Sequence, residues 1–362
     1  MPQRILLKLN MYNESLILPP EWAEQSAIQL TWPHVNTDWN YCLDDILHTY
    51  ECMADAITRH ERLIVVAPDT VCVKQQLEKR LSKTQMSNII FHRCETNDTW
   101  ARDHAFITLI GKDATSTLLD FCFNGWGEKF KADKDNAINR SLYNSGVLKG
   151  NYADLNDFVL EGGSIETDGH GTIFTTSSCL LAPHRNQPMT REDIEDRLLS
   201  CLHGQRLIWI EHGHLEGDDT DGHIDTLVRT APDYTLLYIG CDDKNDVHYE
   251  ELKEMERQLQ SLRTPEGDAY RLIKLPMPDA IYEDGERLPA TYADFVIING
   301  AVIYPTYNQP DKDEQAKRAI KAAFPDREMI GIDSCTVVRQ HGSLHCCTMQ
   351  YPQKVDICNN KS

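Results

Sequence analysis

Predicted strands and helices alternate along this chain about four or five times, and this alternation limits its possible folds more than any other feature. Several helical segments are amphipathic and start with capping residues, as at Thr190-Arg-Glu-Asp, whose helix is expected to end near Gly204. The strands between the helices are short, apolar and β-branched. No Pro-rich or Gly-rich linker divides the 362 residues. We therefore expect one α/β domain over residues 1–362, built from repeated strand–helix units.

The periodicity of the apolar residues gives approximate bounds for these elements. Helices are expected at 43–60, 190–204, 247–262 and 310–324. Strands are expected at 63–67, 89–92, 105–110, 116–122, 172–176, 207–211, 224–228, 234–239, 270–274, 294–305 and 328–338.

Composition and charge exclude several classes of protein. The longest apolar runs, such as Phe295-Val-Ile-Ile298, have the length of a strand and are too short to cross a bilayer. The first residues lack a secretory signal, and the 12 cysteines include no Cys-x-x-Cys pair, so we expect a cytoplasmic protein with reduced thiols. A formal net charge of −20 argues against nucleic-acid binding and suits a small cationic partner.

Residues 217–225, Gly-Asp-Asp-Thr-Asp-Gly-His-Ile-Asp, hold the densest group of ionisable side chains. A calcium loop of the EF-hand type is disfavoured, because a glycine and a valine would occupy its first and last ligand positions. Zinc stays open as an alternative, since His212 and His214 precede His223, although no cysteine pair accompanies them. A solvated acidic turn and a site for an organic cation are the other interpretations.

The surroundings of this segment favour a site over a solvated turn. The residues on either side, 207–211 and 224–228, are apolar and β-branched and are expected to form strands. Alternate side chains of an extended chain share one face. We therefore expect Asp221, His223 and Asp225 to point in the same direction.

Three further segments combine reactive or charged side chains with turn residues. Gln340–Gln350 contains Cys346 and Cys347, and in an extended chain at most one of these thiols can face a cleft. Asn97–Asp103 places a tryptophan and two carboxylates ahead of a strand. Leu160–Glu166 has a carboxylate directly before a Gly-Gly turn, which allows the backbone to approach a ligand closely. Each segment alone is also compatible with a buried thiol, a surface ion pair or a tight turn.

These segments belong to an ordered set of motifs that runs from about residue 19 to about residue 351. The set comprises Leu30-Thr-Trp-Pro-His34 with Asp38-Trp39, Asn97-Asp-Thr-Trp-Ala-Arg-Asp103, Phe123-Asn-Gly-Trp-Gly127, Leu160-Glu-Gly-Gly-Ser164, Gly217–Asp225, Asn299-Gly-Ala-Val-Ile-Tyr-Pro305 and Gly342-Ser-Leu-His-Cys346. It resembles the guanidine-modifying enzymes of the pentein superfamily, most closely the agmatine deiminase branch, also called the bacterial peptidylarginine deiminase type. The resemblance implies an α/β fold, a five-bladed propeller with pseudo-fivefold symmetry and a central active site.

The resemblance also implies catalytic roles. Cys346 matches the nucleophile, which attacks the guanidinium carbon and forms a covalent amidino-cysteine. His223 would protonate the departing ammonia and then activate water, with Glu161 as its carboxylate partner. Asp103 and Asp225 complete the catalytic set. We expect the acidic surroundings to raise the proton affinity of His223.

The substrate-binding residues follow from the same resemblance. Asp103 and Asp225 would grip the guanidinium, and Trp100 would form an aromatic wall beside it. Asp219 matches a position implicated in agmatine binding, and Asp218 is a weaker candidate. The expected reaction converts agmatine to N-carbamoylputrescine and ammonia, a step toward putrescine, and it needs neither a metal nor a cofactor.

Several alternatives remain open from the sequence. A peptidylarginine deiminase or a free-arginine deiminase would use the same chemistry on a different tail. A non-catalytic binder of cationic amines and a zinc hydrolase with His212, His214 and His223 are the others. The sequence also leaves the oligomeric state open, a homo-oligomer included.

Two positions depart from the family's pattern. The run Gln340–Leu344 stands where many relatives have more glycine together with asparagine, and Asp294 stands where asparagine is expected. We expect neither to contact the catalytic residues, and both to affect the choice of substrate.

Overall fold

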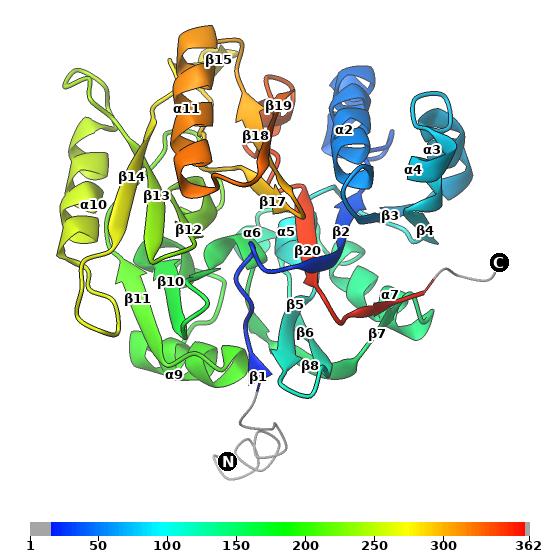
Figure 1. Cartoon of the computed structure of the whole chain (residues 1–362), viewed down its shortest axis with the longest axis horizontal. Helices are drawn as coiled ribbons and strands as arrows, with labels where there is room; N and C mark the ends of the chain where they lie inside the picture. The colour runs from blue at the N-terminus through cyan, green and yellow to red at the C-terminus, as the bar shows by residue number, and fades with distance from the viewer. Residues whose placement is uncertain (1–15, 359–362) are drawn as a thin grey trace.

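The structure, a computed structural model, describes residues 16–358 and contains five sheets of three or four strands arranged in a ring (Figure 1). The helices that connect the strands cover the outside of the ring. The five-bladed α/β propeller that the resemblance implies is confirmed by this arrangement. Within residues 16–358, none of the helices has both the length and the apolar character that crossing a bilayer requires.

Every blade repeats the same succession of elements. In the third blade, β9 (Glu166–Thr167) pairs antiparallel with β10 (Thr172–Thr176), and the chain then forms α9 (Arg191–Leu202). It returns as β11 (Arg206–Ile210), which pairs parallel with β10. A parallel pair needs such a crossover, because its second strand must start again from the same end of the sheet. The first strand of a blade lies nearest the axis, as β12, β17 and β20 show in Figure 1.

The other blades have the same order with small additions. The second is β5 (Ile107–Gly111), β6 (Ser116–Cys122), α7 (Ile138–Asn144) and β8 (Asn151–Val159), with β1 (Leu16–Ile17) at its edge. The fourth is β12 (Val228–Ala231), β13 (Thr235–Gly240), α10 (Tyr249–Ser261) and β14 (Arg271–Pro276). The fifth is β17 (Val296–Ile298), β18 (Ala301–Thr306), α11 (Pro310–Ala323) and β19 (Glu328–Asp333).

The first blade joins segments from near both ends of the described chain. Its first strand is β20 (Thr348–Pro352), which pairs antiparallel with β2 (Gln25–Thr31) and so closes the ring. The blade continues with α2 (Leu43–Thr58), β3 (Arg62–Ala67), α3 (Thr70–Leu77), α4 (Lys83–Ser87) and β4 (Ile89–Arg93).

Short elements fill the connections between these units. They are η1 (Asp38–Cys42), α5 (Ala101–His104), α6 (Gly125–Glu128), η2 (Asp135–Ala137), β7 (Leu148–Lys149) with β21 (Asp356–Ile357), η3 (Gly162–Ser164), α8 (Ser177–Leu180), η4 (Ile224–Thr226), β15 (Tyr282–Glu283) with β16 (Glu286–Arg287), and η5 (Val337–Gln340).

The predicted helices at 43–60, 190–204, 247–262 and 310–324 are confirmed with small shifts at their ends. Helix α9 begins with the predicted capping box, in which the hydroxyl of Thr190 accepts from the backbone N–H of Asp193 and the carboxylate of Asp193 accepts in return. Such reciprocal bonds satisfy N–H groups that a helix start leaves unpaired.

Three predicted strands are wrong in part. Residues 224–226 form the 3-10 turn η4, and the strand begins only at Val228. The segment 294–305 is a hairpin, because Asn299 and Gly300 form a two-residue turn in which Gly300 has a φ of 73°. The segment 328–338 leaves its strand after residue 333 and continues into η5.

Arg229 of β12 joins three blades through a buried guanidinium. Its Nε lies 2.5 Å from Glu166 of the third blade, and its Nη2 lies 2.5 Å from Glu21, which precedes β2. Its Nη1 donates to the carbonyls of Ala293 and Phe295, just before the fifth blade. All the charges in this group are buried, so each partner is needed to compensate the others.

We predict that Arg229→Ala lowers the free energy of unfolding by about 3–5 kcal/mol, because it removes the ion-pair partner of buried Glu166 and the shortest ion pair of buried Glu21. Urea denaturation followed by circular dichroism measures this change. Arg318→Ala is the matched control, since Arg318 is exposed and pairs with Glu314 on the same helix. The urea concentration at the midpoint of its unfolding should equal that of the wild type. A loss below 1 kcal/mol in Arg229→Ala would show that the network is not required.

Candidate active site

Each blade contributes a chemically active side chain just before the start of its first strand. The sequence positions are regular: Asp103 before β5, Glu161 before β9, His223 and Asp225 before β12, Asp294 before β17, and Cys346 before β20. All six side chains are buried. The repeat of the fold therefore brings together residues that lie up to 243 positions apart in the chain.

Cys346 lies in a turn between η5 and β20. Its thiol lies 3.4 Å and 3.7 Å from the two carboxylate oxygens of Asp294, to which it donates. The neighbouring Cys347 is also buried, but it packs in the core and does not line the cavity beside Cys346. The prediction that only one of the two thiols faces a cleft is confirmed, although the two cysteines lie in a turn and not in an extended chain.

The two carboxylates of the expected clamp are held in different ways. Asp103 accepts from the indole Nε1 of Trp126 at 2.9 Å and from the backbone N–H of Gly163 at 3.1 Å. Oδ2 of Asp225 lies 2.7 Å from Nδ1 of His345, whereas its buried Oδ1 has no hydrogen-bond partner in the described part of the protein. An unpaired buried oxygen is costly unless a ligand donates to it.

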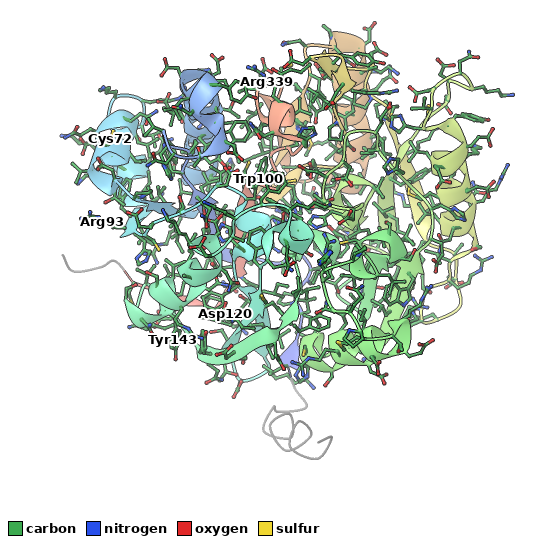
Figure 2. The ribbon with its side chains drawn as sticks, turned by 180° about the vertical axis from the view of Figure 1, so that it is seen from behind. Cys72, Arg93, Trp100, Asp120, Tyr143 and Arg339 are labelled. Carbon is green, nitrogen blue, oxygen red and sulfur yellow. The ribbon has the colours of Figure 1, made fainter. Side chains whose placement is uncertain are left out.

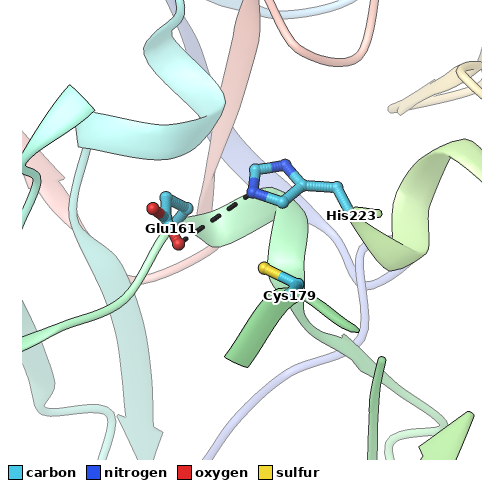
Figure 3. A group of neighbouring side chains, drawn as sticks. All are labelled: Glu161, Cys179 and His223. Carbon is cyan, nitrogen blue, oxygen red and sulfur yellow. Dashed lines mark ion pairs between the residues drawn. The ribbon is translucent and has the colours of Figure 1, made fainter. Parts of the chain in front are cut away.

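His223 lies between two carboxylates. Its Nδ1 is 3.6 Å from Oδ1 of Asp103, and its Nε2 is 4.0 Å from Oε2 of Glu161, as the dashed line in Figure 3 shows. Both oxygens of Glu161 accept from Nε of Arg185 at 3.2 Å. Cys179 lies beside His223 and Glu161 in the same figure, fully buried. The arrangement leaves Nε2 of His223 free of a short hydrogen bond within residues 16–358.

A small cavity opens at Cys346, with a volume of about 390 Å³ including its mouth. Trp100 and Trp126 form aromatic walls, and Figure 2 shows Trp100 near the middle of the molecule. The cavity is lined by Asp38, Asp98, Trp100, Asp103, Trp126, Phe130, Asp219, Thr220, Gln340, His341, Gly342 and Cys346. Its lining contains carboxylates but neither lysine nor arginine, so it suits a cation.

Burial controls the protonation of the acidic groups. It raises the pKa of Asp103 well above its usual value, and the nearby charges of Asp225 and Glu161 add to this effect. Burial likewise raises the pKa of Asp225 and of Glu161, although Arg185 opposes it at Glu161. It also raises the pKa of Asp219 to about 6. A cation between these groups would favour their ionised forms.

His223 does not have the raised proton affinity that the sequence predicts. Burial lowers its pKa well below the usual value, and the positive charges of Arg185 and Lys129 lower it further. The two carboxylates beside it stand at 3.6 Å and 4.0 Å, too far for hydrogen bonds that would hold a proton on the ring. His223 is therefore a neutral imidazole in the free protein at neutral pH.

Two other expectations about this region are wrong. Asp221 does not point with His223 and Asp225: it has a φ of 67°, and its carboxylate accepts from Arg185 at 2.6 Å and from Lys129 at 2.9 Å. Asp294, which was not expected to contact the catalytic residues, accepts from the Cys346 thiol.

The run Gln340–Leu344 also differs from its expectation, because Gln340, His341 and Gly342 line the cavity together with Cys346. A Cβ on Gly342 would lie 2.3 Å from the ring of Trp100, so this position requires glycine.

The zinc alternative has no geometric support. No group of three metal-ligand atoms in residues 16–358 includes His212 or His214. His212 is instead 3.7 Å from Glu251 near the surface. Asp218, the weaker substrate candidate, accepts from the backbone N–H groups of Thr220 and Gly222 and so shapes the loop.

Sequence reasoning missed three residues that organise the site. Arg185 donates to Glu161, and Trp126 donates to Asp103. His345 connects Asp225 to Glu21, because Nε2 of His345 lies 2.8 Å from Oε2 of Glu21. Trp126 and His345 stand inside motifs that were recognised, but their partners are distant in sequence. Arg185 lies in no recognised motif.

Comparisons with known proteins show the family of the chain. The chain matches, over residues 17–352, the family described as Porphyromonas-type peptidyl-arginine deiminase. It is 30% identical to an agmatine deiminase of Ectopseudomonas mendocina (strain ymp), over 92% of this chain and 95% of that protein.

Solved structures are similar over nearly the whole chain. A Porphyromonas gingivalis protein provisionally named an arginine deiminase is 48% identical, with a TM-score of 0.89 over 95% of this chain and all of that one (100%). The agmatine deiminase of C. jejuni, solved with substrate bound in a cysteine-to-serine variant, is 34% identical, with a TM-score of 0.86 over 94% and 97% of the two chains.

We predict that iodoacetamide modifies Cys346 slowly at pH 7 and faster as the pH rises, by roughly tenfold per pH unit up to pH 9. The reason is that burial, together with Asp294, Asp225 and Asp103, raises the pKa of its thiol, and only the thiolate reacts. Peptide mass spectrometry reads the rate, with the exposed Cys72 as an internal reference. Modification of Cys346 at pH 7 that outpaces Cys72 would contradict this prediction.

Proposed function

The chain belongs to the Porphyromonas-type peptidyl-arginine deiminase family, and we propose that it hydrolyses agmatine to N-carbamoylputrescine and ammonia. The observation that carries this proposal is the juxtaposition at the axis of the fold. The buried thiol of Cys346 and the buried carboxylate of Asp103 line one cavity that suits a cation. The imidazole of His223 lies 3.6 Å from that carboxylate, and the carboxylates of Asp225 and Asp294 lie within 4.8 Å of the thiol. The residue roles that follow are part of the proposal, and none of the steps needs a metal or an organic cofactor.

The clamp recognises the guanidinium group by charge and by geometry. A guanidinium is planar, carries a positive charge at any physiological pH and offers a fixed set of N–H donors. Oxygens of Asp103 and the unpaired Oδ1 of Asp225 accept from these donors. Trp100 contributes an aromatic face to the cavity, which also favours a cation. The cation favours the charged forms of carboxylates that burial alone would protonate.

In the first half of the reaction, the sulfur of Cys346 attacks the guanidinium carbon. The bound positive charge lowers the pKa of the thiol, so the nucleophile becomes active mainly when substrate is present. A tetrahedral adduct forms, and one nitrogen leaves as ammonia with the proton that the thiol gave up. A covalent amidino-cysteine remains, which retains the positive charge.

In the second half, neutral His223 accepts a proton from water as the water adds to the amidino carbon. Its lowered pKa leaves the imidazole ready to act as a base. Glu161, held by Arg185, lies 4.0 Å from Nε2 and stabilises the imidazolium that forms. The carbon–sulfur bond then breaks, the thiolate takes the proton of the new hydroxyl group, and the ureido product leaves. His223 releases its proton to solvent, where the proton converts ammonia to ammonium.

The tail of the substrate is the basis for choosing agmatine. Besides Asp103, the cavity presents Asp38 and Asp219, which suit a primary ammonium and repel a carboxylate. It also presents Asp98, whose pKa burial raises to about 8, so that this group becomes charged only beside a cation. Lys129 donates to the main-chain oxygen of Asp219 and pairs with the carboxylate of Asp221, and its charge lowers the pKa of Asp219 only in part against burial. A free-arginine deiminase is the second candidate, because the 48% identical structure carries that provisional name.

We also propose that the enzyme works in the cytoplasm as a single catalytic unit over residues 1–362, either alone or as a homo-oligomer. All 12 cysteines of the chain are free thiols in the structure, which suits a reducing compartment. The net charge of −20 supports a small cationic substrate and gives no support to a nucleic-acid partner.

We predict that the protein releases ammonia from agmatine with a kcat/KM at least about tenfold above that for free arginine or an arginyl peptide, because the carboxylate-lined cavity penalises an α-carboxylate. A coupled ammonia assay on the three substrates measures this ratio. Cys346→Ala should lose all activity while it keeps the wild-type circular dichroism spectrum. Preference for arginine would favour the second candidate, and activity that survives in Cys346→Ala would exclude the covalent mechanism.

Gly163 allows three reacting groups to meet. A Cβ at this position would lie 2.6 Å from Nδ1 of His223, 2.9 Å from Oδ1 of Asp103 and 2.9 Å from Oδ2 of Asp225. Real Cβ atoms do not come so close to other atoms, so any other residue must displace the imidazole or the clamp. The Gly-Gly turn that the sequence shows is therefore part of the site.

We predict that Gly163→Ala lowers kcat/KM for agmatine by roughly 100-fold or more, because displacements of about 1 Å have effects of this size. Gly331→Ala is the control, since Gly331 is exposed on β19 and its Cβ would lie at least 3.0 Å from its nearest neighbours, the side chains of Thr306 and Tyr304. Steady-state kinetics of the two variants give the comparison. Near-normal activity in Gly163→Ala would mean that the clamp and His223 tolerate rearrangement.

A further inference from the structure

Asp294 is the contribution of the fifth blade to the site. It stands two residues before β17, where the other blades carry Asp103, Glu161, the His223–Asp225 pair and Cys346 before their own first strands. Each of those residues has a role in the proposed reaction, on which this inference rests. Asp294 has none so far, although it is buried and touches the nucleophile.

Asp294 contacts the turn of Cys346 twice. Its carboxylate accepts from the thiol, with oxygens at 3.4 Å and 3.7 Å from the sulfur, and its main-chain oxygen accepts from the N–H of His345 at 3.3 Å. Within residues 16–358, no other side chain accepts a hydrogen bond from this thiol. Reactive atoms of Asp225, Asp294 and Cys346 all lie within 4.8 Å of one another, so the carboxylate stands beside the clamp as well.

We propose that Asp294 is a catalytic residue, the base that takes the proton of the Cys346 thiol as the sulfur attacks the guanidinium carbon. The S–H bond breaks, the S–C bond forms, and the proton rests on the carboxylate. It then passes to the nitrogen whose C–N bond breaks. A thiol and a guanidinium cation thus give an amidino-cysteine cation and ammonia, with no net gain or loss of protons.

This assignment divides the two halves of the reaction between two bases. His223 makes no hydrogen bond to the thiol, so it is not placed to take the thiol proton. Burial raises the pKa of Asp294 to about 7, so this carboxyl can both accept and release a proton near neutral pH. Asp294 then serves amidino-cysteine formation, and His223 serves its hydrolysis.

Several charged or titratable groups act on Asp294. The acidic groups are Cys346, Asp225, Asp218 and Tyr307, and the cations are Arg229 and Arg102. A bound guanidinium adds a positive charge to this group and shifts Asp294 toward its ionised, basic form. The base is therefore ready when the substrate is present.

Asp294→Asn tests the role, because it keeps the shape and removes the basic oxygen. Rapid mixing with agmatine, acid quench and mass spectrometry measure how fast Cys346 gains the amidino group. In the wild type, this rate should level off above about pH 7. In the variant it should fall roughly 100-fold at pH 7 and then rise about tenfold per pH unit, because solvent must remove the proton. Hydrolysis of the adduct should change little.

Asp120→Asn is the matched control. Asp120 is a buried carboxylate of β6 that accepts from Asn139 and Tyr152. It lies apart from Trp100 in Figure 2 and does not line the cavity. It should keep the wild-type rate and pH profile.

Three results would overturn the proposal for Asp294. One is an unchanged rate of adduct formation, and another is a rise in KM alone, which would make Asp294 only a ligand of the cation. The third is an equal loss at every pH, which would make its role structural. If the proposed function itself were wrong, the wild type would form no adduct with agmatine, and this outcome is separate from the other three.

Discussion

The buried guanidinium of Arg229 is the interaction on which the remaining structure depends. It ties the third, fourth and fifth blades to the segment before β2, at a place where no solvent can compensate the charges. The network continues from Glu21 through His345 to Asp225, so it also reaches the clamp. The position of a catalytic carboxylate is thereby linked to the ion network that joins the blades.

The protein holds two guanidinium groups at its axis in the same manner. Arg229 is the permanent one, bound between Glu21 and Glu166. In the proposed reaction the substrate is the exchangeable one, bound between Asp103 and Asp225. In the permanent site the charges balance within the fold. In the catalytic site they do not, and burial raises the pKa of both carboxylates until a cation arrives. The positive charge of the substrate then accounts both for its affinity and for the activation of the thiol.

The sequence predicted the architecture well, because capping residues, amphipathic periods and apolar strands are local signals. It missed the hairpin at Asn299-Gly300, although Asn-Gly between apolar runs is itself a strong hairpin signal. The residue types at the site were also predicted. Their protonation was not: the charge state of His223 depends on burial and on Arg185, which is 38 residues away in sequence. Contacts such as that of Asp294 with Cys346 exist only once the blades close.

The closure of the ring by β20 has a consequence for the timing of activity in a cell. The nucleophile precedes the last strand of the ring, and that strand pairs with β2 from the opposite end of the described chain. A ribosome must therefore release almost the whole chain before the thiol can meet its clamp, its imidazole and its neighbouring carboxylate. Incomplete chains carry Cys346 outside the site or lack it. The proposed chemistry therefore requires a chain that has folded as far as β20.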